Sequence, residues 1–192
     1  MEKLIDIDRQ IVLFINGANN PFIDELMWQI SGRLIWIPLY LLIFFLAYKK
    51  FGWRLAVFYA VFTFSCFAFS DLLSNQIKYV FERLRPSHNE FFNGKLHLYQ
   101  ISRKEFYTGG SFGFVSSHAS NFFTLSFSFF LILGKTYPKM KYILFIISAL
   151  VCYSRIYLGV HYLSDIIGGA IVGTFIAFIF HRFVWKKMFK NI

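Results

Sequence analysis

The sequence predicts an all-α integral-membrane protein, a helical bundle of about five transmembrane helices preceded by an N-terminal amphipathic helix at the membrane interface. Of its 192 residues, 57% are hydrophobic and only 16% are charged. A soluble core could not hide so much apolar surface, so the lipid bilayer is the expected solvent. Long apolar runs follow one another along the chain, and lysines gather at the ends of these runs. The length suits a single domain.

The first element expected is an amphipathic helix over residues 1–20. Leucine, isoleucine and valine alternate there with acids and one arginine. The stretch is too short and too charged to cross a membrane, so we expect it to lie in the interface. Turn-forming residues at 17–21 end it. Residues 21–192 then form the membrane-embedded domain.

Five apolar runs follow, and each predicts one transmembrane helix. They cover about residues 24–48, 55–77, 118–133, 142–157 and 163–183. Residues 78–117 form the only long polar segment, an outer loop between the second and third spans. No internal repeat of the kind found in transporters is visible.

The distribution of charge predicts which side of the membrane each loop occupies. Two short loops and the C-terminal tail carry the basic residues Lys49, Lys50, Arg54, Lys135, Lys139, Lys141, Arg182, Lys186, Lys187 and Lys190, and no acid. The positive-inside rule places these segments in the cytoplasm. The N-terminal helix, the outer loop and the turn before the fifth span then lie outside, as expected for a bacterial-type inner membrane protein with its site on the periplasmic face.

Other function classes are disfavoured by composition. The net charge of +10 forms no basic patch of the kind that follows a nucleic acid, so no nucleic-acid partner is expected. Cys66 and Cys152 lie inside apolar runs and are interpreted as small core residues rather than a disulfide. The oligomeric state is not predicted.

Three polar blocks carry chemistry-bearing residues, and the third of them, residues 154–165, is the most informative. If the chain is helical from Val160, His161 and Asp165 are four residues apart and share one face. The carboxylate can then hold one imidazole nitrogen and leave the other free to attack or to carry a proton. Arg155 is a permanent cation suited to phosphate oxygens. The alternative is an interfacial loop in which Arg155 and Asp165 simply pair.

The other two blocks flank the outer loop. Lys78 and Arg85 are seven residues apart, close to two helical turns, and can point the same way; the alternative is a basic anchor at the membrane edge. Ser116, Ser117 and His118 open the third span, where a serine can cap the helix. An anion is also favoured at such a helix start. Together the three blocks suit a phosphate group and the charge that it develops during transfer.

The order and spacing of these blocks resemble the three-part signature of the type 2 phosphatidic acid phosphatase superfamily. The matching patterns are Lys78-x6-Arg85-Pro86, Ser116-Ser117-His118 and Ser154-Arg155-x5-His161-x3-Asp165. In the second part, Val115 and Ser117 replace the proline and glycine usual in the family. The resemblance covers roughly residue 71 to the fifth span and implies a helical bundle.

The resemblance also implies roles for the matching residues. His161 would be the nucleophile that forms a phospho-histidine, with Asp165 orienting its ring, and His118 would be the general acid. The phosphoryl group would be held by Lys78, Arg85, Arg155, the Ser116 side chain and the backbone around Ser117. No metal and no cofactor are implied, and the sequence has no clustered carboxylates or histidines for a metal cage. Because His161 must be neutral and His118 charged, a bell-shaped pH profile is expected.

Polar residues outside the signature carry weaker expectations. Asp71 either supports Lys78 or is an ordinary acid at a helix end, and His88 could line the pocket. Arg83 and other charged residues of the outer loop are expected to decorate its surface, and His97 to be solvated or interfacial.

The leading functional hypothesis is therefore an integral-membrane lipid phosphatase acting at the outer leaflet. Substrates consistent with the family are undecaprenyl pyrophosphate, phosphatidylglycerol phosphate, phosphatidic acid and the phosphates of lipid A, with a lean towards a simple lipid (pyro)phosphate. The alternative is a lipid-phosphate transporter or flippase that uses the same cations. A family member that only binds is disfavoured by the intact His118, His161 and Asp165. Haloperoxidase chemistry is disfavoured because those relatives are soluble.

Overall fold

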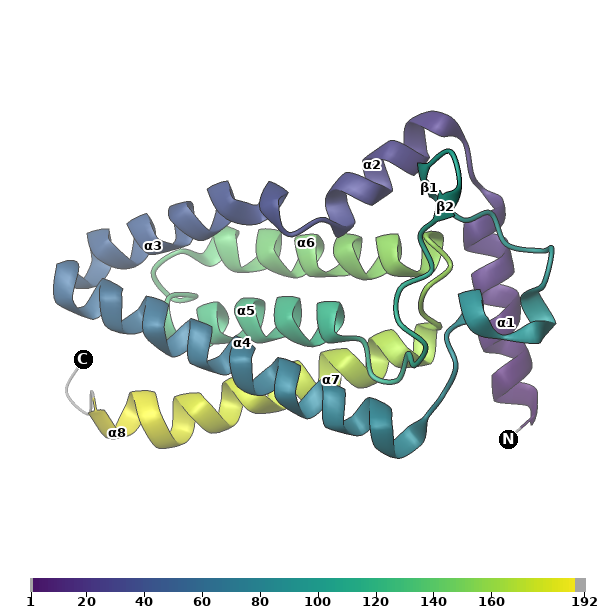
Figure 1. Ribbon diagram of the computed structural model, residues 1–192. Helices are drawn as coiled ribbons and strands as arrows, with labels where there is room; N and C mark the ends of the chain where they lie inside the picture. Colours follow the sequence, from purple (N-terminus) through teal and green to yellow (C-terminus); the bar gives the residue numbers. More distant parts are fainter. Residues whose placement is uncertain (1, 189–192) are drawn as a thin grey trace.

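The computed structural model describes residues 2–188 as a bundle of long helices with a cap of short elements at one end (Figure 1). The long helices are α3 (Ile37–Phe51), α4 (Trp53–Phe81), α5 (Ser117–Ile132), α6 (Pro138–Tyr157) and α7 (Leu163–Phe180). A π-helical turn, η4 (His181–Trp185), and α8 (Lys186–Met188) continue α7. Lys190, part of the predicted cytoplasmic tail, lies outside the described residues.

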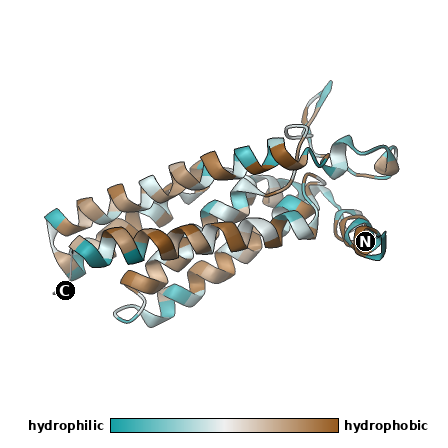
Figure 2. Ribbon diagram, turned by 90° about the horizontal axis from the view of Figure 1, so that it is seen from below, coloured by the Kyte–Doolittle hydropathy of each residue, from teal (hydrophilic) through white to brown (hydrophobic). Residues whose placement is uncertain are grey.

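Four of these segments are long and apolar enough to cross a membrane: Leu34–Phe51, Trp53–Phe81, Pro138–Tyr157 and Leu163–Met188. Hydrophobic residues dominate the middle of the bundle, and hydrophilic residues gather towards its ends (Figure 2). The remaining long helix, α5, has 16 residues and packs against α4, α6 and α7 at once. It is therefore the central helix of the bundle. The predicted fold class is confirmed.

The predicted first span over residues 24–48 is wrong in its bounds, because two helices share this segment. Helix α2 (Pro21–Ser31) ends where the Gly32 N–H donates to the carbonyls of Trp28 and Gln29. The backbone of Gly32 is extended, with ψ of 156°, which no helix can continue. A 3-10 turn, η1 (Leu34–Trp36), then leads into α3, whose first turn holds Pro38 at a position that proline favours.

The cap is built from α1 (Glu2–Gly17), α2 and the outer loop. The loop contains two 3-10 turns, η2 (Pro86–His88) and η3 (Glu90–Phe92), and a hairpin of β1 (Gln100–Ser102) and β2 (Glu105–Phe106) in antiparallel register. Asn16 of α1 is buried and donates to the carbonyls of His97 at 2.8 Å and Tyr157 at 2.7 Å. The partly exposed His97 ring pairs with Asp24 of α2 at 2.8 Å and so joins the outer loop to α2.

Glycines on α7 let α5 approach it closely. A Cβ added at Gly173 would lie 2.0 Å from the Ser120 carbonyl oxygen, and one added at Gly169 would lie 2.4 Å from that of Ser116. The Thr124 hydroxyl donates to the Gly173 carbonyl at 3.0 Å. Small residues allow helix backbones to meet in this way inside a membrane. The start of α5 is thereby fixed beside the start of α7.

We expect Gly173→Ala to destabilise the protein by about 1–3 kcal/mol or more, because the added methyl meets backbone that cannot rotate away. Thermal unfolding in detergent would show a lowered Tm. Gly17→Ala is the matched control, since a Cβ there meets nothing within 4 Å. Equal Tm values for the two variants would contradict the close α5–α7 contact.

Candidate active site

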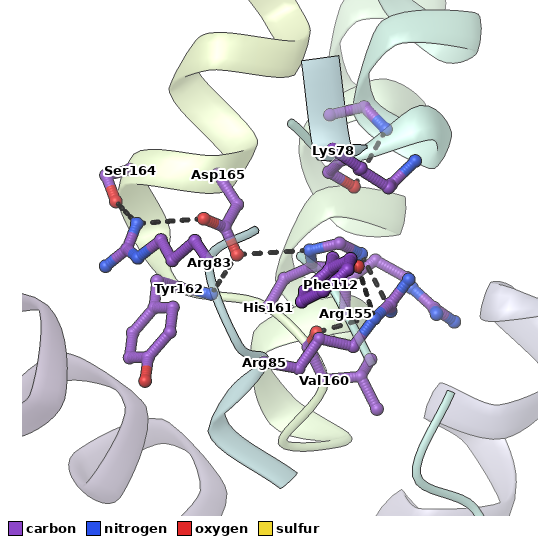
Figure 3. A network of polar contacts seen from close by, with 12 residues as sticks. Lys78, Arg83, Arg85, Phe112, Arg155, Val160, His161, Tyr162, Ser164 and Asp165 are labelled. Atoms are coloured by element: carbon purple, nitrogen blue, oxygen red, sulfur yellow. Dashed lines mark hydrogen bonds and ion pairs between the residues drawn. The ribbon is translucent and has the colours of Figure 1, made fainter. Parts of the chain in front are cut away.

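The three polar blocks meet in one cavity of about 760 Å³ at the capped end of the bundle. Lys78 comes from the last turns of α4, Arg155 from the end of α6, and His118 from the first turn of α5. Arg85 and His161 come from the loops that follow α4 and α6. The cavity lining includes Lys78, Arg85, Ser117, His118, Arg155 and His161. Figure 3 shows the side chains around His161.

His161 is held in one tautomer by its two neighbours. Its Nε2 lies 3.1 Å from Nη1 of Arg85, and its Nδ1 lies 3.2 Å from Oδ2 of Asp165 (Figure 3). A guanidinium can only donate hydrogen bonds, so Nε2 must accept and the ring proton must be on Nδ1. That proton is donated to Asp165. Nε2 is therefore unprotonated and its lone pair faces Arg85, which lines the same cavity, and an unprotonated nitrogen is what a nucleophile requires.

The surroundings of His161 also keep its ring neutral. The residue is only 1% exposed, and this burial lowers its pKa well below the usual 6.5; the positive charges of Arg85 and Arg155 lower the pKa further. Desolvation and nearby cations both disfavour the protonated imidazole. A neutral, singly oriented ring at physiological pH follows.

A glycine-containing segment of the outer loop wraps closely around Arg85. The Arg85 Nε donates to the Phe112 carbonyl at 3.1 Å, and its Nη1 lies 3.3 Å from the Val160 carbonyl. A Cβ at Gly109, where φ is +67°, would lie 2.9 Å from Arg85 Nη1. A Cβ at Gly113 would lie 2.8 Å from Oδ2 of Asp165. The loop therefore needs glycine at both positions to close over the site.

Arg155 is buried and aimed by two residues that the sequence did not single out. The Ser31 hydroxyl accepts from its Nη1, and the Tyr107 hydroxyl accepts from its Nη2 at 2.7 Å. Within residues 2–188 its Nε, also buried, has no hydrogen-bond partner. Nothing in the sequence links positions 31 and 107 to position 155. Only the meeting of α2, the loop and α6 brings them together.

The two serines of the second block have different positions. Ser116 is fully buried, and its side chain accepts from the Ala119 N–H at 3.4 Å as the N-cap of α5. Ser117 lines the cavity, and its hydroxyl accepts from Lys78 Nζ at 2.6 Å. The structure thus differs from the expectation that the Ser116 side chain faces the phosphate, because capping the helix uses that hydroxyl.

Arg83 does not decorate the loop surface as expected. Its Nη1 donates to Oδ1 of Asp165 at 2.9 Å, and its Nη2 donates to Oδ2 of Asp8 at 2.8 Å. Its guanidinium also lies over the Tyr162 ring, 4.0 Å from the centroid. The local sequence around Arg83 gives no signal of these two partners, since both carboxylates come from distant segments.

Asp71 and His88 differ in their position relative to the cavity. Asp71 lines the cavity, and its Oδ1 accepts from Asn121 at 2.9 Å; Lys78 instead donates to Asn75 and Ser117. His88 is exposed and outside the cavity lining. Among the described residues, no group of three or more His, Cys, Asp or Glu side chains is placed to hold a metal ion.

Comparisons with known proteins identify a family and several related phosphatases. The family model that describes sequences of the PAP2 superfamily matches residues 59–189 of this chain. The chain is 35% identical to a lipid A 4'-phosphatase of Bacteroides thetaiotaomicron, over 97% of this chain and 80% of that protein. It is 33% identical to an undecaprenyl-diphosphatase of Sulfolobus acidocaldarius, over 93% of this chain and 79% of that one.

A solved structure shares the fold. The transmembrane PAP2 type phosphatidylglycerolphosphate phosphatase of Bacillus subtilis superposes with a TM-score of 0.68 at 23% identity, over 97% of this chain and 88% of that chain. The chain therefore belongs to the PAP2 superfamily, as the motifs predicted. The predicted class, an integral-membrane hydrolase of lipid phosphate esters, is confirmed at that level.

The state of His161 sets the expected pH dependence. Because its pKa lies below 6.5, the ring is still neutral in mildly acidic solution, and protonation of His161 should cause no loss of kcat/KM as the pH falls through 6.5. The decline should come only at more acidic pH, where the ring takes up a proton and its lone pair is lost. Initial rates measured across pH test this. Half of the activity lost near the ordinary pKa of a histidine would contradict it.

Proposed function

We propose that the protein removes a phosphate from a membrane lipid by forming a phospho-histidine on His161, with a lipid A phosphate as the first candidate substrate. The observation that carries the proposal is the cavity itself. It places the unprotonated Nε2 of His161, in contact with Arg85, in a cavity that Lys78 and Arg155 also line and that continues into an apolar wall. That combination fits a charged headgroup joined to a hydrocarbon tail.

The first chemical step is attack of Nε2 on phosphorus. The new N–P bond forms as the bond to the leaving oxygen breaks, and His118 gives its proton to that oxygen. Lys78, Arg85 and Arg155 neutralise the charge that develops on the equatorial oxygens. For Arg85 this means exchanging its contact with Nε2 for one with the phosphate. Asp165 stabilises the positive charge that His161 acquires.

The second step releases inorganic phosphate. His118, now neutral, accepts a proton from a water molecule that attacks phosphorus, and the N–P bond breaks. The electron pair returns to Nε2 and restores the neutral ring. One water is consumed and one phosphate leaves in each cycle, with no redox change and no step that requires a metal.

The apolar part of the cavity supports a route for the lipid tail. Tyr40 of α3 and Phe64 and Phe67 of α4 line the same cavity as the cations. Phe64 is also 66% exposed on the outer surface of the bundle, where lipid would lie. A lipid entering between α3 and α4 could therefore keep its tail in the bilayer while its phosphate reaches His161.

The choice of lipid A as the first candidate rests on similarity. The Bacteroides relative, which the chain matches over 97% of its length, is a lipid A 4'-phosphatase. A polyprenyl pyrophosphate is the second substrate class to test, because the Sulfolobus relative is an undecaprenyl-diphosphatase. Both headgroups would present a phosphate with a hydrocarbon anchor.

The distribution of charge supports a periplasmic site in a bacterial-type inner membrane. The site and its cap of α1, α2 and the outer loop lie at one end of the bundle (Figure 1). The basic loops around Lys49, Lys50 and Lys135 lie at the opposite end. By the positive-inside rule the latter end is cytoplasmic.

We expect His161→Ala to lower the rate of phosphate release from lipid substrates by about 1,000-fold or more, because the nucleophile is lost. Phosphate release by purified protein in detergent, over a panel of lipid A, polyprenyl pyrophosphate, phosphatidic acid and phosphatidylglycerol phosphate, measures it. His88→Ala is the control, an exposed histidine outside the cavity. Full activity in folded His161→Ala would refute the proposal. Movement of intact lipid across vesicles without phosphate release would favour a flippase.

Metal independence is expected from the proposed mechanism, since side chains supply every charge that it needs. Activity should be unchanged after prolonged treatment with a chelator and should not rise when Mg²⁺ or Zn²⁺ is added back. Loss of activity on chelation, restored by one of these ions, would show that a metal takes part in the reaction.

A further inference from the structure

An acid of the N-terminal helix is connected to the nucleophile through two side chains, Arg83 and Asp165. Asp8 of α1 is 7% exposed and pairs with Nη2 of Arg83 at 2.8 Å. Nη1 of Arg83 pairs with Oδ1 of Asp165 at 2.9 Å. The other oxygen, Oδ2, accepts from Nδ1 of His161. Figure 3 shows the part of this chain from Arg83 to His161.

Asp8 also holds the first turn of α7. Its Oδ1 accepts from the backbone N–H of Ser164 at 3.1 Å, and its Oδ2 accepts from the Ser164 hydroxyl. That hydroxyl in turn accepts from Arg83 Nη1 at 2.5 Å. Asp8 and Ser164 therefore fix the guanidinium from two directions. An arginine so held presents one defined N–H to Asp165.

The orientation of Asp165 decides what His161 can do. Asp165 is fully buried, and a buried carboxylate is costly unless its oxygens are paired. Arg83 satisfies Oδ1, while the Tyr162 N–H at 3.0 Å and the His161 ring satisfy Oδ2. Without Arg83, the carboxylate could turn about its χ2 and take Oδ2 away from Nδ1. The ring would then lose the contact that keeps its proton on Nδ1.

We propose that Asp8 and Arg83 are positioning residues for the phosphatase reaction: through Asp165 they hold His161 in the tautomer whose Nε2 can attack phosphorus. The N-terminal amphipathic helix thus supplies part of the catalytic geometry, besides any role at the membrane surface. The inference rests on the proposed function of His161 as nucleophile. Neither residue lines the cavity, so substrate binding is not their task.

The first test replaces Asp8 and compares it with a neighbour on the same helix. We expect Asp8→Ala to lower kcat about 10- to 100-fold, by analogy with the loss of an outer hydrogen-bond partner of a metal-bound histidine, with KM nearly unchanged. Asp6→Ala is the control, because the Asp6 side chain is 64% exposed and its ion pair within residues 2–188 is with Arg9. It removes the same charge from α1 and should leave kcat unchanged.

The second test varies Arg83 and separates positioning from a purely structural role. Arg83→Gln should lower kcat at least as much as Asp8→Ala. Arg83→Lys keeps a cation that can reach Asp165 and should recover part of that loss. A structural role alone predicts a fall in folded protein and in Tm, with normal kcat per folded molecule and no rescue by lysine.

The third test observes the ring directly and needs no substrate. In ¹⁵N-histidine-labelled protein in detergent, the His161 signals, assigned by their absence in His161→Ala, should show one tautomer with the proton on Nδ1. In Asp8→Ala and Arg83→Gln the Nδ1 and Nε2 shifts should move towards each other as the tautomers mix. Unchanged shifts and unchanged kcat in both variants would overturn the proposal.

The tautomer measurement distinguishes failure of the proposed function from failure of the positioning role. If the wild type releases no phosphate from any lipid, the proposed function fails while the histidine spectrum still reports on the Asp8–Arg83–Asp165 chain. If the wild type is active and both variants match it, only the positioning role fails.

Discussion

The close contact between the starts of α5 and α7 is the constraint on which the site depends. The Ser116 N–H donates to the Asp165 carbonyl at 3.0 Å, so the two helix starts are joined directly by backbone. Further along, Gly169 and Gly173 leave no room for side chains between the helices. His118 on α5 and Asp165 on α7 therefore have fixed relative positions, set by packing that lies deep in the bundle.

Positive charge is in excess in the cavity beside this helix contact. Lys78, Arg85 and Arg155 face one cavity, whereas the buried acid, Asp165, is already engaged by Arg83 and His161. Cations in a poorly solvated site attract an anion more strongly than they would in water. The same cations, together with burial, lower the pKa of His161. The proposed phosphate site and the neutral state of the proposed nucleophile, His161, thus have the same physical cause.

Local spacing made much of this site predictable. His161 and Asp165 are four residues apart in the sequence, and their side chains meet at 3.2 Å. The apolar runs identified the long helices, and the lysines at their ends identified the loops. The family signature supplied the order of the three blocks and the residues that now line the cavity.

Contacts between distant segments were not predictable in the same way. Arg83 meets Asp8 across 75 positions of sequence, and Arg155 meets Ser31 across 124, and no periodicity encodes such pairs. The break at Gly32 was missed because the segment that starts at Asp24 and the apolar run that starts at Leu34 were interpreted as one helix, and hydropathy does not record backbone direction. Ser116 and Ser117 are neighbours of the same type, so only the geometry of the α5 cap assigns one to the helix and the other to the cavity.

The central claim is that the unprotonated Nε2 of His161 accepts the phosphoryl group in the cavity that Lys78, Arg85 and Arg155 line. Rapid mixing of the enzyme with a ³²P-labelled lipid phosphate, quenched in alkali to preserve phosphoramidates, followed by proteolysis and mass spectrometry, measures it most directly. We expect the label on the peptide that contains His161, bound at Nε2. Label on His118, or steady turnover with no labelled peptide at any quench time, would contradict the claim.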